Sequence, residues 1–493
     1  METKKFFIWV LGISTFARLL MAKIVPISGD EAYFIIWAKH LNYGYYEHPP
    51  MIGWIMWLFS FAGNDIFIYR MFPVISVVIM SVFMVGVLKE IDENKAYLCA
   101  SIFLLSPVSI LNILSVNDVP LIFFTFLAGV FFYRAFKQNR LPYAALSGFF
   151  WGCAFLSKYF SVLFGFSVLF ICFIYREKPL WKITAISLLS ALPLIFINLL
   201  WNYDNCWLNI MFNLFFRNKN LSFNFLSFIV YAIEQIVLMT PFLAIIFIKN
   251  GFLWNRIRRD SLNLKFFWYF FIIPQVFFSV LSFIKSIGLH WTASFLPFFF
   301  MFAISMRQDI LDRAARHAFY LSIAIVMVVL VLVSIPTDVF KSWEKYPQIV
   351  MFKEPVELCE AINRESKRRI LASTGYTETS VLSYYCKKEF VLFGSMSRSG
   401  RYYDYINDFK KFDGRDFFIV SLNKRDAEKF LNYFKTVNID HIDIRGAKFY
   451  FIYGDGFIFN TYRQLYLAKI LQMYYNPPDF LPSGTNFFRE KYF

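Results

Sequence analysis

Long apolar stretches separated by short polar loops dominate the first two thirds of the chain. Runs of roughly 18 or more apolar residues with few charges are typical of transmembrane helices. The pattern predicts membrane helices at 6–25, 71–88, 97–114, 119–136, 143–157, 159–175, 181–200, 223–248, 266–284, 291–306 and 317–335. The stretch 51–62 is too short to cross a bilayer and is predicted to form a helix at the membrane interface. We therefore expect a multi-pass α-helical membrane protein with about 11 transmembrane helices.

After about residue 337 the pattern changes to short alternating elements. "RRILASTGYTETSVLSYYCKKEFVLFG" predicts a strand, a glycine-containing turn, a helix and a strand. "RDFFIVSLNKRDAEKFLNYFKTVNIDHIDIRGAKFYFIY" predicts a strand, a helix and two further strands. The chain is thus predicted to comprise a transmembrane domain, 1–336, and a small α/β domain, 337–493.

Composition agrees with this division. The 493 residues are 58% hydrophobic and 22% aromatic, and the mean hydropathy of +0.50 is too high for a soluble protein of this size. The formal charge of +16 could suggest a nucleic-acid partner. The basic residues instead lie in short loops between apolar runs, as membrane topology requires, so no nucleic-acid binding is predicted.

The distribution of basic residues predicts the orientation in the membrane. With a cytoplasmic N-terminus, eighteen Lys and Arg residues fall in cytoplasmic segments and seven in the opposite loops before the C-terminal domain. This bias favours a cytoplasmic N-terminus and places the C-terminal domain outside the cytoplasm. The first apolar run shows no convincing small-residue cleavage site, so we expect a retained helix.

The six cysteines give weaker indications. Cys99, Cys153 and Cys172 lie in apolar runs and are expected to be small buried side chains. Cys359 and Cys386 could pair if their domain is outside the cytoplasm, but their spacing leaves this open. No CxxC motif is present, so a thiolate zinc site is not expected.

Polar side chains interrupt the apolar pattern at several places. The candidates for chemistry are Asp30, Glu31, Glu47, His48, Asp118, Lys158, Arg217 and His290. All of them fall on the external side in the topology obtained from charge counting, and charges held at membrane depth are usually functional. A carboxylate can take a proton from an acceptor, and cations can stabilise a phosphate leaving group. Without a Walker A or dinucleotide motif, a lipid-linked donor is the natural candidate for transfer outside the cytoplasm.

Several segments resemble a known family. "DEAYFIIWAKHLNYGYYEHPPMIGW", "NDVPLIFF", "LSKY", "LIFINLLWNYDNCW" and "HWTASFLP" are similar to successive motifs of bacterial membrane glycosyltransferases. The family is related to dolichyl-phosphate-mannose protein mannosyltransferases and lipid A aminoarabinose transferases. The likeness extends to "SYYCKKEFVLFGSMSRSGRYYDYIND" in the C-terminal domain. It implies a type-C glycosyltransferase fold in a bacterial inner membrane, with a periplasmic C-terminal domain, a polyprenyl-phosphate sugar donor and inversion at the anomeric carbon.

The resemblance also implies roles in the first external loop. Asp30 matches the catalytic base, and Glu31 would orient the loop or the acceptor. Glu47 and His48 match the Glu-Lys-Pro-Pro element of the aminoarabinose transferases, with His in place of Lys. This replacement argues against aminoarabinose as the sugar and makes the charge at that position dependent on pH.

The remaining candidates lie in later loops. By the same resemblance Lys158 and Arg217 would bind the donor phosphate, Asp118 would support the site, and His290 would contact substrate; Lys219 could serve in place of Arg217. The ligand set around Glu47 and His48 is incomplete, so no metal is predicted, although a divalent ion is conceivable.

Simpler structural readings stay open for these residues. Asp30 and Glu31 could cap a helix, and Asp118 could be an ordinary N-cap. Lys158 could extend to the membrane interface, and His290 with Trp291 could belong to an aromatic belt.

The function also has alternatives. The leading hypothesis is transfer of a sugar to lipid A or another envelope glycan, with a Ser or Thr hydroxyl of a protein as the alternative acceptor. Two further hypotheses lie outside the enzyme class: a transporter or flippase for a lipid-linked substrate, and a non-catalytic envelope assembly protein. The sugar, the acceptor and the oligomeric state are not determined by the sequence.

Overall fold

The computed structural model describes residues 2–218, 222–249, 262–424, 428–478, 480–482, 484 and 486–493. The chain divides into two compact units. Unit 1 consists of Met1–Val25, Leu58–Ile197 and Asn220–Leu332, and unit 2 of Pro26–Trp57, Asn198–Lys219 and Val333–Phe493. Unit 2 therefore joins two loop segments of the membrane region to the C-terminal part, while the predicted domain boundary at 336/337 stays a prediction.

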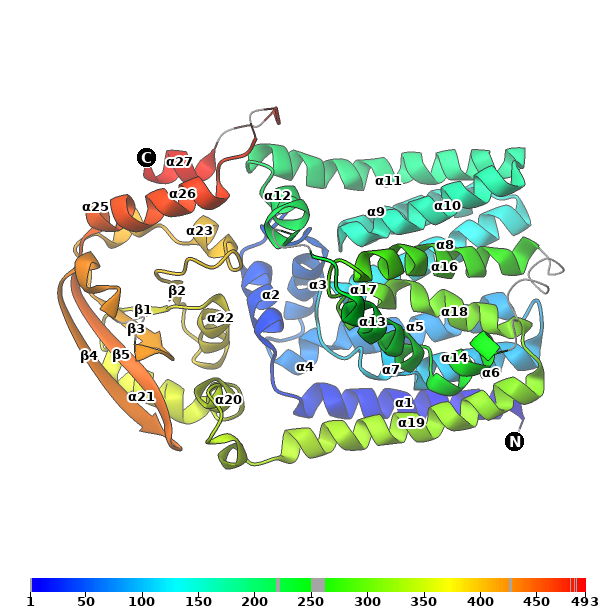
Figure 1. Cartoon of the computed structure of the whole chain (residues 1–493), viewed down its shortest axis with the longest axis horizontal. Coiled ribbons are helices and arrows are strands. Elements are labelled where there is room, and N and C mark those ends of the chain that lie inside the picture. Colours follow the sequence, from blue (N-terminus) through cyan, green and yellow to red (C-terminus); the bar gives the residue numbers. More distant parts are fainter. Residues whose placement is uncertain are drawn as a thin grey trace. The chain divides into compact units, whose positions relative to one another are not determined.

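Unit 1 is a bundle of helices (Figure 1). Its α-helices are α1 (Thr3–Ile24), α4 (Ile66–Tyr69), α5 (Met71–Leu88), α6 (Glu93–Leu105), α7 (Pro107–Ile110), α8 (Asp118–Gln138), α9 (Leu141–Phe155), α10 (Val162–Tyr175), α11 (Lys178–Asp204), α13 (Phe225–Leu238), α14 (Pro241–Lys249), α16 (Leu262–Ser282), α17 (Leu289–Thr292), α18 (Leu296–Phe302) and α19 (Gln308–Ser334), of which α11 and α19 end in unit 2.

Helical structure occurs at every predicted membrane segment. By length and composition, six helices among the described residues could cross a membrane, or seven if one bent pair counts as a single span. Shorter apolar helices occupy Leu141–Phe155, Tyr159–Tyr175 and Leu289–Ser305, and α3 (Met51–Ser60) matches the predicted interfacial helix. The helical membrane fold is thus confirmed, and the count of 11 crossings stays a prediction.

The segment 223–248 is not the continuous helix that the sequence predicts. It forms α13 and α14, which meet at a bend of 109°. Thr240 at this break has φ of +63°, and Pro241 follows it. Proline has no N–H to continue a helical ladder, and its ring disfavours helical geometry at the preceding residue.

The predicted segment 97–114 is also interrupted, between α6 and α7. Pro107 starts α7, so the backbone carbonyls near the break lack their usual partners. The guanidinium of Arg18, fully buried in α1, donates hydrogen bonds to the carbonyls of Leu104 (2.6 Å) and Ser109 (3.1 Å). A buried cation therefore stabilises the broken helix.

The helices α9 and α11 approach each other closely because small residues line their contact. A Cβ atom on Gly148 would lie 2.0 Å from the carbonyl oxygen of Ser187, and one on Gly152 would lie 2.8 Å from Leu194. The two glycines are four residues apart, the spacing typical of closely packed membrane helices. The hydroxyl of Ser187 donates to the carbonyl of Ala144 (2.9 Å) and adds a polar link.

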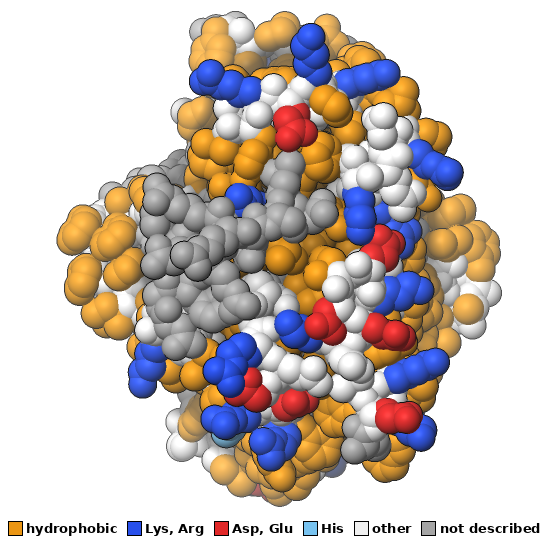
Figure 2. Space-filling model, turned by 90° about the vertical axis from the view of Figure 1, so that its right-hand side faces the viewer, with side chains coloured by type: hydrophobic (Ala, Val, Ile, Leu, Met, Phe, Trp, Pro, Cys, Tyr) orange, Lys and Arg blue, Asp and Glu red, His pale blue; other side chains and the backbone are white. Residues whose placement is uncertain are grey.

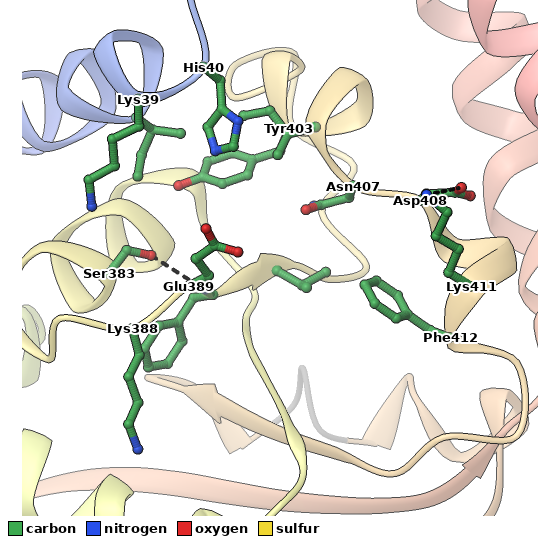
Figure 3. A pocket seen from close by; sticks show the side chains of 14 residues that line it. Lys39, His40, Ser383, Lys388, Glu389, Tyr403, Asn407, Asp408, Lys411 and Phe412 are labelled. Carbon is green, nitrogen blue, oxygen red and sulfur yellow. Dashed lines mark hydrogen bonds and ion pairs between the residues drawn. The ribbon is translucent and has the colours of Figure 1, made fainter. Parts of the chain in front are cut away.

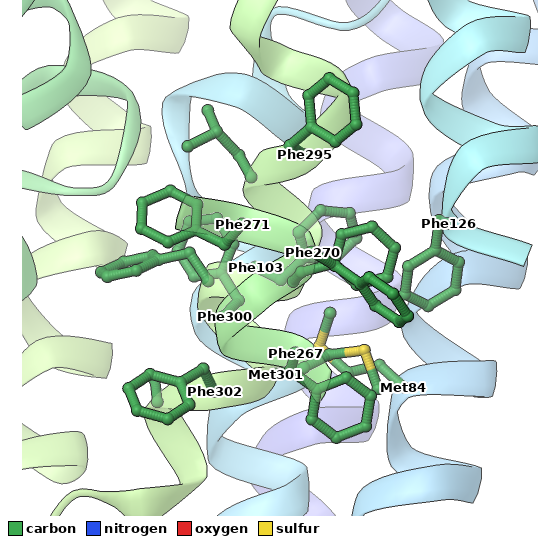
Figure 4. Close-up of a cluster of buried hydrophobic side chains, with 14 of the residues drawn as sticks. Met84, Phe103, Phe126, Phe267, Phe270, Phe271, Phe295, Phe300, Met301 and Phe302 are labelled. Carbon is green, nitrogen blue, oxygen red and sulfur yellow. The ribbon is translucent and has the colours of Figure 1, made fainter. Parts of the chain in front are cut away.

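Aromatic side chains fill the interior of unit 1. Phe270 lies 5.1 Å from Phe298 between ring centroids, and Phe271 lies 5.2 Å from Phe299. Figure 4 shows this cluster, with rings from α6, α8, α16 and α18 meeting in the bundle. Because lipid is as apolar as these rings, close packing rather than water exclusion holds the helices together.

One end of unit 1 carries many basic side chains. Figure 2 shows Lys and Arg, with some Asp and Glu, around this end face and apolar side chains at its edges. The basic residues predicted to be cytoplasmic are exposed at Lys4, Lys5, Lys89, Lys137, Arg140, Arg176, Lys178, Lys182, Lys249, Arg307, Arg313 and Arg316. Arg256, Arg258 and Arg259, and Lys219 on the opposite side, lie outside the described residues.

Unit 2 contains a five-stranded sheet. The strands are β1 (Ile370–Ser373), β2 (Val391–Leu392), β3 (Phe417–Ser421), β4 (Phe434–Ile444) and β5 (Ala447–Phe457), in the order β2-β1-β3-β5-β4. β1 pairs in parallel with β2 and β3, and β5 pairs antiparallel with β3 and β4. The predicted strand-helix-strand order is confirmed for β1, α22 (Tyr376–Tyr385) and β2. The helix predicted after β3 falls partly on 425–427, outside the described residues.

Helices complete unit 2. They are α2 (Gly29–Lys39), α12 (Leu208–Leu214), α20 (Tyr346–Lys353), α21 (Pro355–Ser366), α22, α23 (Tyr402–Ile406), α25 (Phe459–Tyr462), α26 (Ala468–Tyr474) and α27 (Phe487–Tyr492). A disulfide joins Cys359 of α21 to Cys386 at the end of α22, with Cα atoms 5.1 Å apart. Disulfides persist in oxidising compartments, so this bond agrees with a C-terminal domain outside the cytoplasm.

Candidate active site

Three of the predicted site residues come together in unit 1. Asp118 starts α8, Lys158 follows α9, and His290 belongs to α17. The ammonium nitrogen of Lys158 lies 2.7 Å from one carboxylate oxygen of Asp118, and Nε2 of His290 lies 3.9 Å from the other. A single carboxylate therefore orients two groups that can carry positive charge.

This cluster is closed on one side and open on the other. The side chains of Lys158 and Asp118 are only 6% and 7% exposed, whereas that of His290 is 55% exposed. Two buried charges are tolerated because each satisfies the other. Asn117, rather than Asp118, is the N-cap residue of α8, and Lys158 pairs with a buried carboxylate rather than extending to the interface. The cluster can present positive charge to an anionic group that approaches past His290.

Asp30 and Glu31 have different environments at the start of α2. Ser28 and Glu31 form a capping box: the Ser28 hydroxyl accepts from the Glu31 N–H (3.2 Å), and the Glu31 carboxylate accepts from the Ser28 N–H (3.0 Å). Glu31 is fully buried, so the helix-capping interpretation holds for it. Asp30 is exposed and available to solvent.

Asp30 lies beside the start of α22. Burial, followed by the charge of Asp30, raises the pKa of Tyr376 to about 12. A Cβ on Gly29 would lie 2.5 Å from a methyl group of Thr377, so only glycine allows α2 and α22 to approach this closely. An exposed carboxylate fixed between two helix starts is suited to accept a proton from a substrate hydroxyl.

Glu47 is the centre of a buried network in unit 2. Its carboxylate accepts hydrogen bonds from the hydroxyl of Tyr33 (3.1 Å) and the N–H of Gly400 (2.6 Å). The Tyr33 hydroxyl in turn accepts from the N–H of Tyr402 (3.1 Å). Burial raises the pKa of Glu47 to about 7, which the hydrogen bonds from Gly400 and Tyr33 oppose. Glu47 therefore links the first loop to the segment at 400–402 and titrates near neutral pH.

The segment that contains "WNYDNCW" supports the same loop. The side-chain amide of Asn209 donates to the carbonyls of Tyr45 (2.9 Å) and Tyr46 (3.1 Å), and that of Asn213 donates to the carbonyl of Glu47 (2.9 Å). These bonds hold the backbone around Glu47 in a single conformation.

The other two candidates lie at the edges of this network. His48 is half-buried and precedes Pro49, Pro50 and the start of α3. Arg217 lies in a 3₁₀ turn after α12, with its guanidinium 5.7 Å from the ring of Phe212. Their proposed contacts with substrate stay predictions.

The sequence did not reveal the partners of these residues. Tyr33, Tyr376 and Gly400 contact or neighbour the predicted site, yet none has an unusual residue type or spacing. The ion pair of Arg401 and Asp404 (3.1 Å), both buried, was also not anticipated. The only available signal was that "SGRYYDY" lies inside a segment with family resemblance.

Metal binding was tested against the same geometry. Among the residues that the structure describes, no group of three or more His, Cys, Asp or Glu side chains is arranged to hold a metal ion. Asp118 and His290 lie close together, but they provide only two potential ligand side chains.

The chain resembles known membrane glycosyltransferases in part of its sequence and in its fold. Residues 47–201 match the family described as dolichyl-phosphate-mannose-protein mannosyltransferase. The fold is similar to that of ArnT from Cupriavidus metallidurans in the apo state, with a TM-score of 0.65 and 10% identity over 92% of this chain and 98% of ArnT. The chain therefore resembles this mannosyltransferase family over residues 47–201 and shares the fold of ArnT. The expected type-C glycosyltransferase fold is thereby confirmed.

A second ArnT structure and one further protein are similar to this chain. ArnT from the same organism bound to undecaprenyl phosphate gives a TM-score of 0.66 at 11% identity, over 91% of this chain and 98% of ArnT. Lipid A galacturonosyltransferase RgtD from Rhizobium johnstonii is 30% identical over 139 residues, which is 27% of this chain and 29% of RgtD. The chain thus matches less than a third of the length of that relative. The mannosyltransferase match includes Glu47, Asp118 and Lys158 and excludes Asp30.

Proposed function

We propose that this membrane protein is an inverting glycosyltransferase that moves a sugar from a polyprenyl phosphate, namely undecaprenyl phosphate, to lipid A or another envelope glycan. The observation that carries the proposal is the buried pair of Lys158 and Asp118, with His290 on its open side, in an apolar helical unit. Such a charge pair matches the anionic leaving group of a lipid-linked donor. The likeness to ArnT with bound undecaprenyl phosphate supports this donor class.

The chemistry divides between acid–base and electrostatic roles. The carboxylate of Asp30 takes the proton of an acceptor hydroxyl, and the hydroxyl oxygen attacks the anomeric carbon opposite the phosphate. The new C–O bond forms as the bond from that carbon to the phosphate oxygen breaks. Lys158 stabilises the negative charge of the departing polyprenyl phosphate, while Asp118 holds Lys158 in place. Arg217 and His290 contribute further positive charge to the donor phosphate.

The remaining residues position substrate and loop. Glu31 fixes the start of α2, and Glu47 fixes the first loop against Gly400. His48 follows Glu47 and contacts the sugar or its phosphate. His48 stands where Lys occurs in that element, which argues against aminoarabinose as the sugar.

Mass spectrometry of lipid A tests the proposal. Cells with and without this gene are compared, and the deletion is complemented with the wild-type gene, with Asp30→Asn, or with the exposed control Asp440→Asn. We expect one sugar mass to disappear on deletion and to return with the wild type and Asp440→Asn. We expect Asp30→Asn to reduce transfer by at least roughly 100-fold at normal expression, the scale of lost general-base catalysis.

The outcomes separate the alternatives. Restoration by Asp30→Asn would refute the catalytic role of Asp30. Unchanged lipid A would remove lipid A as the acceptor. Analysis of cell-envelope glycoproteins then tests the second candidate, transfer to Ser or Thr, which the match to the protein mannosyltransferase family favours.

A further inference from the structure

A pocket of about 210 Å³ lies within unit 2 (Figure 3). Its walls come from the end of α2, from α22, from the segment that includes β2, and from residues 403–412. None of the eight predicted site residues lines it. Its volume corresponds to about seven water molecules in the liquid, which is enough for one sugar ring.

Asn407 is the polar group that best indicates a ligand. Asn407 is 7% exposed. Its backbone carbonyl accepts hydrogen bonds from the ammonium group of Lys491 and from the hydroxyl of Tyr492. The structural bonds therefore use the backbone. The side-chain amide makes no hydrogen bond to any described residue, and it points into the pocket (Figure 3). Its amide donors and its carbonyl oxygen are therefore free to bind a ligand in the pocket.

Two further polar groups face the same space. The carboxylate of Glu389 points toward the ring of His40 and the ring of Tyr403 (Figure 3). Burial lowers the pKa of His40, so its neutral ring offers one donor and one acceptor. Together with Asn407, these side chains present both donors and acceptors to a ligand with several hydroxyl groups.

The apolar walls and the charge balance narrow the ligand class. The rings of Tyr403 and Phe412 line the pocket, and the Tyr403 hydroxyl is already engaged with Ser380 (2.9 Å). The charged side chains in the lining are Lys39, Lys388 and Lys411 on one side and Glu389 and Asp408 on the other, so the pocket carries little net charge. Lys411 lies 3.6 Å from Asp408. Aromatic walls with a few oriented polar groups suit a neutral, hydroxyl-rich ring.

We propose that this pocket binds a sugar residue of the glycan acceptor. The inference rests on the proposed function, in which the acceptor is a glycan. It assigns a recognition site to the C-terminal domain and first loop, separate from the residues proposed for transfer.

Direct binding to the full chain in nanodiscs tests this site. The probes are the β-1,6-linked glucosamine disaccharide and methyl mannoside, measured by calorimetry. We expect the wild type to bind at least one probe, and Asn407→Ala and Glu389→Gln to weaken binding roughly tenfold each, the scale of one lost hydrogen bond. Asn438→Ala and Glu360→Gln, both exposed and outside the pocket, are the matched controls and should bind as the wild type does.

The result that overturns the inference is equally direct. It fails if the wild type binds neither probe, or if Asn407→Ala and Glu389→Gln bind like their controls at unchanged melting temperature. Asp30→Asn should bind the probe normally while losing transfer. If Asp30→Asn transfers sugar normally, the proposed reaction is wrong, whatever the pocket binds. If the pocket variants bind the probe like their controls, the pocket proposal is wrong, whatever the reaction. The two failures are therefore distinguishable.

Discussion

Individual buried charges carry much of the specific chemistry of this protein. Lys158 with Asp118 and Arg401 with Asp404 are ion pairs removed from water, and Glu47 is a buried acid held by neutral donors. Removing one partner of such a pair leaves an uncompensated charge, which is more destabilising than losing both. A double variant that removes both charges should therefore keep much of the stability, so a remaining loss of binding would point to a binding role rather than a structural one.

Lys158 can be tested on this basis. We expect Lys158→Met to lower the free energy of unfolding by about 3–5 kcal/mol, because Asp118 loses its partner. The double variant Lys158→Met with Asp118→Asn should recover most of this stability. Neither should bind undecaprenyl phosphate, whereas the exposed control Lys182→Met should. Thermal unfolding and lipid-binding measurements check this, and normal binding by the double variant would contradict the phosphate role.

Glu47 should make stability depend on pH. Its pKa is raised from 4.5 to about 7 in the folded protein, so the folded state binds the proton more tightly than the unfolded state. The contribution of Glu47 to stability is therefore fully present below about pH 4.5 and is lost as pH rises toward and through 7, by about 3 kcal/mol in total. Glu47→Gln keeps an acceptor for Gly400 and cannot ionise.

Melting temperatures measured from pH 5 to pH 8 test the role of Glu47. The variant should gain stability relative to the wild type as pH rises. The control Glu360→Gln, at an exposed position, should follow the wild type. A difference between Glu47→Gln and the wild type that does not vary with pH would contradict the raised pKa.

At the scale of elements, small residues and prolines decide how helices pack and where they break. Gly148 allows α9 to contact the backbone of α11, and Pro241 separates α13 from α14. Gly29 lets the start of α2 lie close to the side chain of Thr377 in α22. Glycine permits a close contact because it has no side chain, and proline breaks a helix because it has no backbone N–H.

Gly148→Ala should be destabilising for this reason. Its Cβ would lie 2.0 Å from the Ser187 carbonyl oxygen, so α9 and α11 must separate. We expect a loss of about 1–3 kcal/mol, the typical cost of overpacking. Gly12→Ala in α1 is the matched control, because a Cβ there meets nothing within 4 Å. Equal melting temperatures for the two variants would show that the helices adjust without cost.

At the scale of the whole molecule, the division into a helical unit and a sheet-containing unit agrees with a multi-pass protein that carries a domain outside the cytoplasm. The basic end face of unit 1 and the disulfide of unit 2 support the proposed orientation independently. The disulfide can be tested directly by counting reactive thiols before and after reduction.

Thiol labelling checks the disulfide and the compartment together. Cys359 and Cys386 are paired, while the other four cysteines are free and buried. Denatured protein from membranes should therefore react with four maleimide groups before reduction and six after it. Six reactive thiols before reduction would contradict an oxidising location for this domain. The variant Cys359→Ser should show five thiols under both conditions.

The sequence by itself determined the features that depend on local patterns. Apolar run length located the helical membrane segments, and alternation and glycine placed β1, α22 and β2. The assignment of the candidate residues to one side of the membrane by charge counting stays a prediction. The motif order indicated the family that residues 47–201 match and the fold that the chain shares with ArnT. Run length and alternation are visible along the chain because each depends on residues within about 20 positions of one another.

Only the tertiary structure decided which residues meet. Asp118 and Lys158 are 40 residues apart and Glu47 and Gly400 are 353 apart, and no local pattern records such pairs. The same holds for Asn407, an ordinary asparagine in sequence whose side chain lines a pocket in the fold. Burial and partnership arise from packing, and they turn common side chains into an ion pair, a titratable acid or a binding group.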